Sequence, residues 1–148
     1  DSQFNCIKGG GGALTPEKIV ASCAKRLVIV ADYRKNSTHL GQQYKKGVPI
    51  EVLPMALVPV TRKLQALYKK FKPVVRLAGS AKIGPIVTDN GNVIIDLDLQ
   101  GNVIENPVQL DEELRAIPGI IETGLFCGMA SSVYFGNADG SVLAKTKQ

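Results

Sequence analysis

A lysine and four consecutive glycines stand just before a stretch that carries helix-start signals. Lys8 precedes the glycine run 9–12, and Thr15 and Pro16 follow, which suit a helix N-cap and a first helical position. Glycines let the backbone adopt positive φ and approach a ligand closely. A cation, free backbone N–H groups and the positive end of a helix together favour an anionic substrate or a developing oxyanion. The order differs from a P-loop, in which the lysine follows the glycines, and from GxGxxG.

Two more charged residues are candidates for the same site. Glu17 falls in the first turn of the predicted helix, where an acid most often complements the helix dipole. The alternative role for Glu17 is a base that points into the crevice beside the glycine run, and local chemistry alone favours the dipole role. Lys35 follows shortly after an apolar run. It can be a solvated lysine or a phosphate contact, and the sequence favours both roles about equally.

Other reactive groups are few. His39, the only histidine, lies in a polar stretch and is expected at the surface, which argues against a Ser-His-Asp or Cys-His site. The three cysteines are too scattered for a disulfide framework or a zinc site, and we expect them to be small buried side chains. We expect the acids at 111–113 to complement a helix dipole in solvent, and Asp96 and Asp98 to face outward from a strand.

The elements around the candidate site predict a parallel sheet. The apolar run 27–31 is rich in β-branched residues, which is typical of a strand covered on both faces. A preceding strand that ends at Ile7 and an intervening helix complete a βαβ unit. The buried stripe of that helix is predicted at Ile19, Val20, Cys23 and Ala24. The glycine run and residues 32–35 then share the carboxyl edge of the sheet, which favours a ligand site over a merely flexible loop.

Residues 49–126 predict a complete α+β domain. Its order is strand, helix, two strands, helix and strand, as in ferredoxin-like folds. Strands are expected at 50–53, 74–77 and 120–126, and Asn90-Gly91 predicts a type I′ turn in a hairpin over 86–96. The first helix is expected to run to about Phe71. Its buried stripe is predicted at Val60, Leu64, Leu67, Tyr68 and Phe71. The second helix is expected to begin at Asn106-Pro107.

The remaining residues, 1–48 and 127–148, provide two parallel strands, one helix and a closing hairpin. So few elements cannot cover a doubly wound sheet. We therefore predict an α/β protein with a Rossmann-like parallel sheet domain at 1–48 and 127–148, incomplete at its N-terminus. The ferredoxin-like α+β domain at 49–126 is inserted into it.

The chain of 148 residues has a net charge of +5, and many of its bases form one block. The basic block consists of Arg62, Lys63, Lys69, Lys70, Lys72, Arg76 and Lys82. Such a block can bind nucleic acid, but the few aromatic residues are not interleaved with it, so we predict a solvated face and no nucleic-acid partner. The apolar runs are too short to span a bilayer, so no membrane partner is predicted. The cysteine usage predicts a reducing intracellular compartment.

Several segments together resemble the type A ribose-5-phosphate isomerase family across essentially the whole chain. The matching segments, in family order, are 7–22 with Lys8 and the glycine run, 30–35 ending in Asp32-Tyr33-Arg34-Lys35, 49–56, 87–92 with Asp89-Asn90-Gly91, and 117–126. The Asp-Tyr-Arg-Lys run and the closing Val-Tyr-Phe-Gly are more similar to the eukaryotic branch.

The resemblance implies an isomerase of the pentose phosphate pathway that interconverts ribose 5-phosphate and ribulose 5-phosphate without a metal or other cofactor. It implies that Glu17 is the general base between C2 and C1 and that Lys8 faces the enediolate oxygens. Substrate contacts are implied for Lys8, Gly9, Gly10, Gly11 and Lys35. It also implies a cytoplasmic homodimer or homotetramer. The alternative from another class is a non-catalytic sugar-phosphate or nucleotide-binding module.

The sequence departs from the family in one respect. The family has an upstream Gly-Ser-Thr phosphate loop and an Asp-Gly-x-Asp-Glu segment, which would end just before Asp1, and neither is in this sequence. We therefore expect the 148-residue chain by itself to be inactive and its larger domain to be unstable, while the whole protein is the isomerase.

Overall fold

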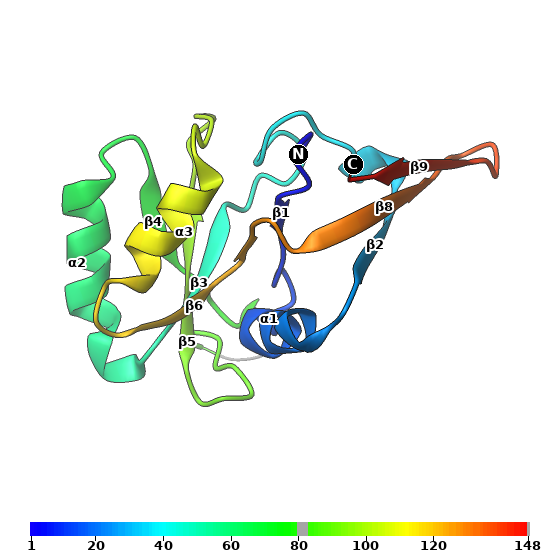
Figure 1. Ribbon diagram of the computed structural model, residues 1–148. Coiled ribbons are helices and arrows are strands. Elements are labelled where there is room, and N and C mark those ends of the chain that lie inside the picture. The colour runs from blue at the N-terminus through cyan, green and yellow to red at the C-terminus, as the bar shows by residue number, and fades with distance from the viewer. Residues whose placement is uncertain (80–82, 148) are drawn as a thin grey trace.

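An antiparallel sheet of four strands lies at the centre of the computed structural model, which describes residues 1–79 and 83–147 (Figure 1). The α-helices of the described part are α1 (Leu14–Cys23), α2 (Leu57–Leu67) and α3 (Pro107–Arg115), with 3₁₀ turns at Tyr33–Lys35 and Pro54–Ala56. The strands are β1 (Cys6–Ile7), β2 (Leu27–Asp32), β3 (Val48–Val52), β4 (Lys72–Val75), β5 (Val93–Asp98), β6 (Ile120–Thr123), β7 (Leu125–Phe126), β8 (Ala130–Gly136) and β9 (Val142–Thr146).

The central sheet has the order β4-β5-β3-β6, and each neighbouring pair is antiparallel. Helices α2 and α3 lie on one face of this sheet and α1 lies on the other (Figure 1). The two faces of β3 differ accordingly. Val48, Ile50 and Val52 join the apolar core beneath α2 and α3, whereas the Glu51 carboxylate bonds to α1. Every residue of β3 is therefore buried.

The second sheet has the order β2-β8-β9, with β2 parallel to β8 and β9 forming the predicted closing hairpin. The expected pairing of the first two strands is wrong, because β1 pairs antiparallel with β7 instead of joining β2. Gly124 accounts for this arrangement. It divides the predicted strand 120–126 into β6 and β7, its carbonyl accepts from the Lys8 N–H at 2.9 Å, and a Cβ there would lie 2.3 Å from the Lys8 carbonyl oxygen.

Two predictions of burial are wrong for this chain. The predicted stripe of α1 is not buried, and β2 is not covered on both faces. Ile19 and Val20 are 59% and 71% exposed, and Cys23 is exposed as well. Residues along β2 alternate between half-buried and exposed, with Val30 78% exposed. No element of the part of the chain that the structure describes covers these exposed apolar side chains.

Three predicted features of the 49–126 region are also corrected. Helix α2 ends at Leu67, which is 56% exposed, although Val60 and Leu64 are buried as expected. Strand β4 begins two residues before the predicted 74–77. The segment 86–88 forms a single isolated bridge, from Val87 to Val93, rather than a full strand, and its turn is not type I′. Only Gly91 there has positive φ, since the Thr88 hydroxyl accepts from two backbone N–H groups of the turn.

Candidate active site

The glycine run forms a tight turn that leads into α1. Gly9 has φ +84°, and a Cβ at this position would lie 2.4 Å from the Cβ of the fully buried Leu14. The Gly12 N–H donates to the Gly9 carbonyl at 3.0 Å, and Gly12 also has positive φ. Glycine is thus required at 9 by both conformation and space. Gly10 and Gly11 do not have positive φ. A Cβ at Gly10 would lie 3.0 Å from the Tyr44 hydroxyl oxygen, whereas no atom lies within 4 Å of a Cβ at Gly11.

Lys8 and Glu17 face each other at the end of this turn. The Lys8 Nζ lies 3.2 Å from Glu17 Oε2, and each side chain is about one third exposed. Lys8 Nζ also lies 5.6 Å from the centroid of the Phe126 ring. Glu17 Oε2 is buried and, within residues 1–79 and 83–147, makes no well-directed hydrogen bond. The structure thus places a carboxylate with free acceptor capacity beside a single cation, which suits transfer of a proton from carbon.

Helix α1 begins two residues earlier than its sequence signals suggest. Ala13 occupies the N-cap position, so the prediction of Thr15 as N-cap is wrong. Thr15 lies two residues before Glu17 in the chain, and its hydroxyl instead donates to the carboxylate of Glu51. The backbone at the start of α1 is thereby tied to the central strand of the neighbouring sheet.

Glu51 is a fully buried carboxylate that sequence reasoning missed. Besides Thr15, it accepts from Thr88 at 2.8 Å, Asn90 at 3.0 Å and Asn92 at 2.9 Å. Burial alone would raise the pKa of Glu51, but these four donors outweigh it and lower the pKa below its ordinary value. A single charge within the apolar run 48–53 was the signal that could have revealed it.

Lys18 ties α1 to the same sheet at a second point. Its Nζ lies 2.7 Å from Glu122 and 3.4 Å from Asp111, and all three side chains are mostly buried. Asp111 also accepts from the Thr123 hydroxyl and from Arg115 Nε at 3.0 Å. The prediction that Asp111 faces solvent is therefore wrong. Asp111 belongs to a buried network because its side of α3 faces β6.

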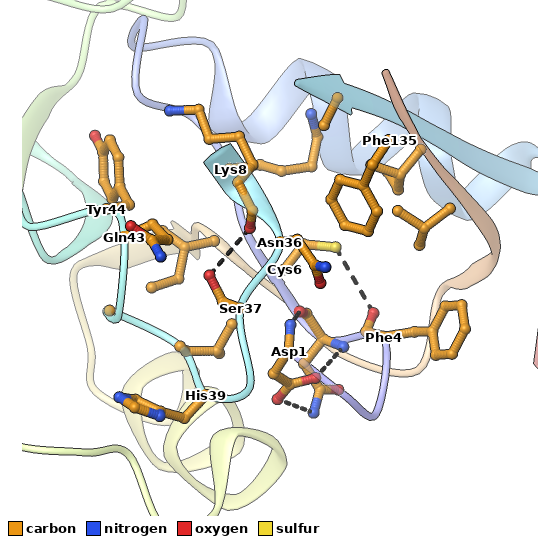
Figure 2. A pocket seen from close by; sticks show the side chains of 18 of the residues that line it. Asp1, Phe4, Cys6, Lys8, Asn36, Ser37, His39, Gln43, Tyr44 and Phe135 are labelled. Atoms are coloured by element: carbon orange, nitrogen blue, oxygen red, sulfur yellow. Dashed lines mark hydrogen bonds between the residues drawn. The ribbon is translucent and has the colours of Figure 1, made fainter. Parts of the chain in front are cut away.

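A cavity of about 340 Å³ opens beside the glycine run (Figure 2). The cavity is lined in part by three lysines, a glycine of the run, a histidine and a tyrosine. These are Lys8, Lys35, Lys145, Gly10, His39 and Tyr44. The Tyr44 hydroxyl is buried and has no hydrogen-bond partner among the described residues. Lys35 Nζ lies 6.0 Å from the centroid of the Tyr44 ring. Much of the remaining lining is apolar, and the three lysines are the side chains that suit a small anionic ligand.

The structure brings together most, but not all, of the predicted site residues. Lys8, Gly10 and Lys35 line the cavity, whereas Gly9, Gly11 and Glu17 do not belong to its lining. Glu17 joins the group through its contact with Lys8. His39, expected at the surface, is half-buried and lines the cavity. Tyr44 and Lys145 were missed, because neither lies near the glycine run in the sequence.

The described ranges do not carry the features of a metal site or a membrane-spanning helix. No three His, Cys, Asp or Glu side chains there are grouped so that they could hold a metal ion. No described helix combines the length and apolar character needed to cross a membrane. Of the basic block, Arg62, Lys63, Lys69, Lys70 and Lys72 are exposed, Arg76 is mostly buried, and Lys82 lies outside the described residues.

Comparison with known proteins identifies the family. The pattern of ribose 5-phosphate isomerase A (phosphoriboisomerase A) matches residues 1–140. The ribose-5-phosphate isomerase of Schizosaccharomyces pombe is 51% identical over 98% of this chain and 52% of its own length. The human protein of that name is 50% identical over 99% of this chain and 46% of its own length. This chain therefore belongs to the ribose 5-phosphate isomerase A family, and it spans about half the length of the curated relatives it matches.

Solved structures agree with this assignment. Ribose 5-phosphate isomerase from Plasmodium falciparum superimposes with a TM-score of 0.89 at 30% identity, covering 99% of this chain and 61% of that one. A D-ribose-5-phosphate isomerase in complex with phospho-erythronic acid gives a TM-score of 0.88 at 39% identity, covering 98% and 60%. The predicted α/β class and family are thus confirmed.

Proposed function

We propose that the whole protein interconverts D-ribose 5-phosphate and D-ribulose 5-phosphate through an enediolate, as an aldose–ketose isomerase of the non-oxidative pentose phosphate pathway. The observation that carries the proposal is the Lys8–Glu17 pair, 3.2 Å apart, beside a cavity that Lys35 also lines. The relatives' names and the neighbour's bound phospho-erythronic acid, a sugar acid phosphate, support the same substrate class.

The side chains suit the chemistry of this reaction. The Glu17 carboxylate takes the proton from C2 of the aldose, and the electrons of the C–H bond pass to the carbonyl oxygen on C1. Lys8 stabilises the negative charge that builds on the enediolate oxygens. Glu17 then returns the proton to C1, while a hydroxyl proton moves from O2 to O1, which gives the ketose. Lys35 binds the anionic phosphate, which supplies binding energy away from the reacting carbons.

Replacing Glu17 by Gln in the full-length protein tests this proposal. The carboxamide keeps the shape but cannot accept the carbon-bound proton, so we expect kcat to fall by at least about 10³-fold. KM for ribose 5-phosphate should change little. The matched control is Glu105→Gln, an exposed carboxylate far along the chain. Turnover of Glu17→Gln near that of the control would exclude Glu17 as the base. Saturable binding without interconversion by the unmodified protein would support the alternative of a non-catalytic sugar-phosphate module.

We further propose that residues 49–126 form an inserted ferredoxin-like domain and that 1–48 with 127–148 belong to a Rossmann-like domain. The antiparallel order β4-β5-β3-β6 with α2 and α3 on one face supports the first part. The parallel β2–β8 pair and the exposed apolar faces of α1 and β2 support the second, with more of that domain covering them in the whole protein. We also propose a cytoplasmic homodimer or homotetramer, which sedimentation of the full-length protein would test.

A further inference from the structure

Arg76 belongs to the predicted basic block, yet its side chain is only 13% exposed and points at the glycine run rather than at solvent. Its backbone lies just beyond β4 and is fixed by two hydrogen bonds. The Arg76 N–H donates to the Ile94 carbonyl at 2.9 Å, and the Arg76 carbonyl accepts from the Ile86 N–H at 2.9 Å. The side chain therefore starts from a rigid position in the central sheet.

One edge of the Arg76 guanidinium is held by Asp96 of β5. Nε lies 2.8 Å from Asp96 Oδ2, and Nη2 contacts Oδ1, so that the pair is bidentate. Both side chains are about 13–14% exposed, which limits screening by solvent. The prediction that Asp96 faces outward into solvent is therefore wrong. The geometry leaves Nη1 free to make other contacts.

Nη1 of Arg76 donates to two consecutive carbonyls of the glycine run. It lies 3.2 Å from the Gly9 oxygen and 3.1 Å from the Gly10 oxygen. In a planar trans peptide, the carbonyl of one residue and the N–H of the next point in opposite directions. Holding the carbonyls of Gly9 and Gly10 thus turns the N–H groups of Gly10 and Gly11 away from Arg76. In residues 1–79 and 83–147, no backbone carbonyl accepts from either N–H.

We propose that Arg76, oriented by Asp96, is a positioning residue that holds the glycine run so that the N–H groups of Gly10 and Gly11 are fixed as donors to the reacting oxygens. A run of four glycines has a large conformational entropy, and donors stabilise a transition state best when they need no reordering. The role rests on the proposed isomerase function. It also gives the 49–126 region a part in positioning the site, because this clamp on the glycine run consists of Arg76, which follows β4, and Asp96 of β5.

The test uses Arg76→Gln and Arg76→Lys in the full-length protein, with Arg62→Gln as the control for loss of an exposed arginine on α2. We expect Arg76→Gln to lower kcat by up to about 100-fold while KM for ribose 5-phosphate changes less than about threefold, because misplaced donors mainly affect the transition state. Arg76→Lys keeps the charge and one donor group and should recover part of kcat. Arg62→Gln should match the unmodified protein.

Hydrogen exchange provides a readout that is independent of activity. The Gly12 N–H, bonded to the Gly9 carbonyl, should exchange at least about 10-fold faster in both Arg76 variants, while the amides of β5 keep their protection. If Arg76→Gln does not fold, Arg76→Lys decides the outcome. A kcat within twofold of the unmodified protein, or an unchanged Gly12 exchange rate, would overturn the proposal. Absence of isomerase activity in the unmodified protein would instead refute the proposed function, and the exchange measurement would still test the clamp.

Discussion

At the scale of single residues, Tyr44 combines two properties that are rarely found together in a stable protein. Its hydroxyl is buried, and it has no hydrogen-bond partner among the described residues, although it lines the lysine-rich cavity. Burial accordingly raises the pKa of Tyr44, so the hydroxyl remains a neutral donor. Buried polar groups without partners cost stability and are uncommon in proteins. We therefore expect this hydroxyl to donate to a substrate bound in the cavity.

Replacing Tyr44 by Phe separates binding from stability. Removal of an unpartnered hydroxyl should leave the melting temperature of the ligand-free protein unchanged or slightly higher. Loss of one hydrogen bond to the substrate should raise KM for ribose 5-phosphate about 3- to 10-fold. Thermal melts with and without phospho-erythronic acid, together with steady-state kinetics, check both expectations. A lower melting temperature with unchanged KM would show that the hydroxyl serves the fold and not the substrate.

The candidate site could be predicted from the sequence only where its residues are close together in the chain. Lys8, the glycine run and Glu17 lie within ten residues, and their residue types indicate a common chemistry. Arg76 and Tyr44 carry no such signal. Arg76 lies in a block of lysines and arginines whose other described members are exposed, and only the fold turns it inward. Long-range contacts of this kind depend on tertiary packing, which no local pattern encodes.

At the scale of elements, the start of α1 is fixed by the buried carboxylate of Glu51. Replacing Glu51 by Gln keeps its size but removes its charge. The charge-assisted bonds from Thr88, Asn90 and Asn92 would be weakened, and the amide nitrogen would face the Thr15 hydroxyl, which now donates to the carboxylate. We expect the free energy of unfolding at pH 7 to fall by about 2–4 kcal/mol. Urea unfolding of the full-length protein measures this loss, with Glu105→Gln as an exposed control.

The pH dependence of the same variant gives an independent test. Because folding lowers the pKa of Glu51 below 4.5, its stabilising effect is present above pH 4.5 and is lost as the pH falls through the folded-state pKa. The unmodified protein and Glu105→Gln should therefore lose more stability between pH 7 and pH 3 than Glu51→Gln does. Equal losses in all three proteins would contradict the assignment of Glu51 as an ionised anchor.

Most helices and strands could be predicted from sequence periodicity and capping residues. The predictions that were wrong have a common cause. Asn106 accepts from the Gln109 N–H and begins α3 as predicted, because this cap uses neighbouring residues alone. Thr15 has an equally good capping signal, but a buried carboxylate from β3 competes for its hydroxyl. Likewise, the short β1 pairs with β7 because Gly124 admits the Lys8 carbonyl, a contact between residues far apart in the sequence.

At the scale of the whole molecule, the two sheets differ in how completely this chain covers them. Strand β3 is buried at every residue between α1 and the helix pair α2 and α3, whereas β2 exposes one apolar face and β9 is exposed throughout. Isosteric replacement of valine by threonine measures such covering, since a hydroxyl forced into an apolar contact costs about 1–3 kcal/mol. An exposed hydroxyl costs almost nothing.

Val30 of β2 is 78% exposed in this chain and provides the critical position. In the isolated 148-residue chain, Val30→Thr should change the free energy of unfolding by less than about 0.5 kcal/mol. In the full-length protein we expect a cost of about 1–3 kcal/mol, because we propose that further residues of the Rossmann-like domain pack against β2 there. Val60→Thr, at a position only 1% exposed beneath α2, should cost about as much in both contexts. If Val30→Thr is equally harmless in the full-length protein, the face of β2 stays open and the sheet is complete without a further layer.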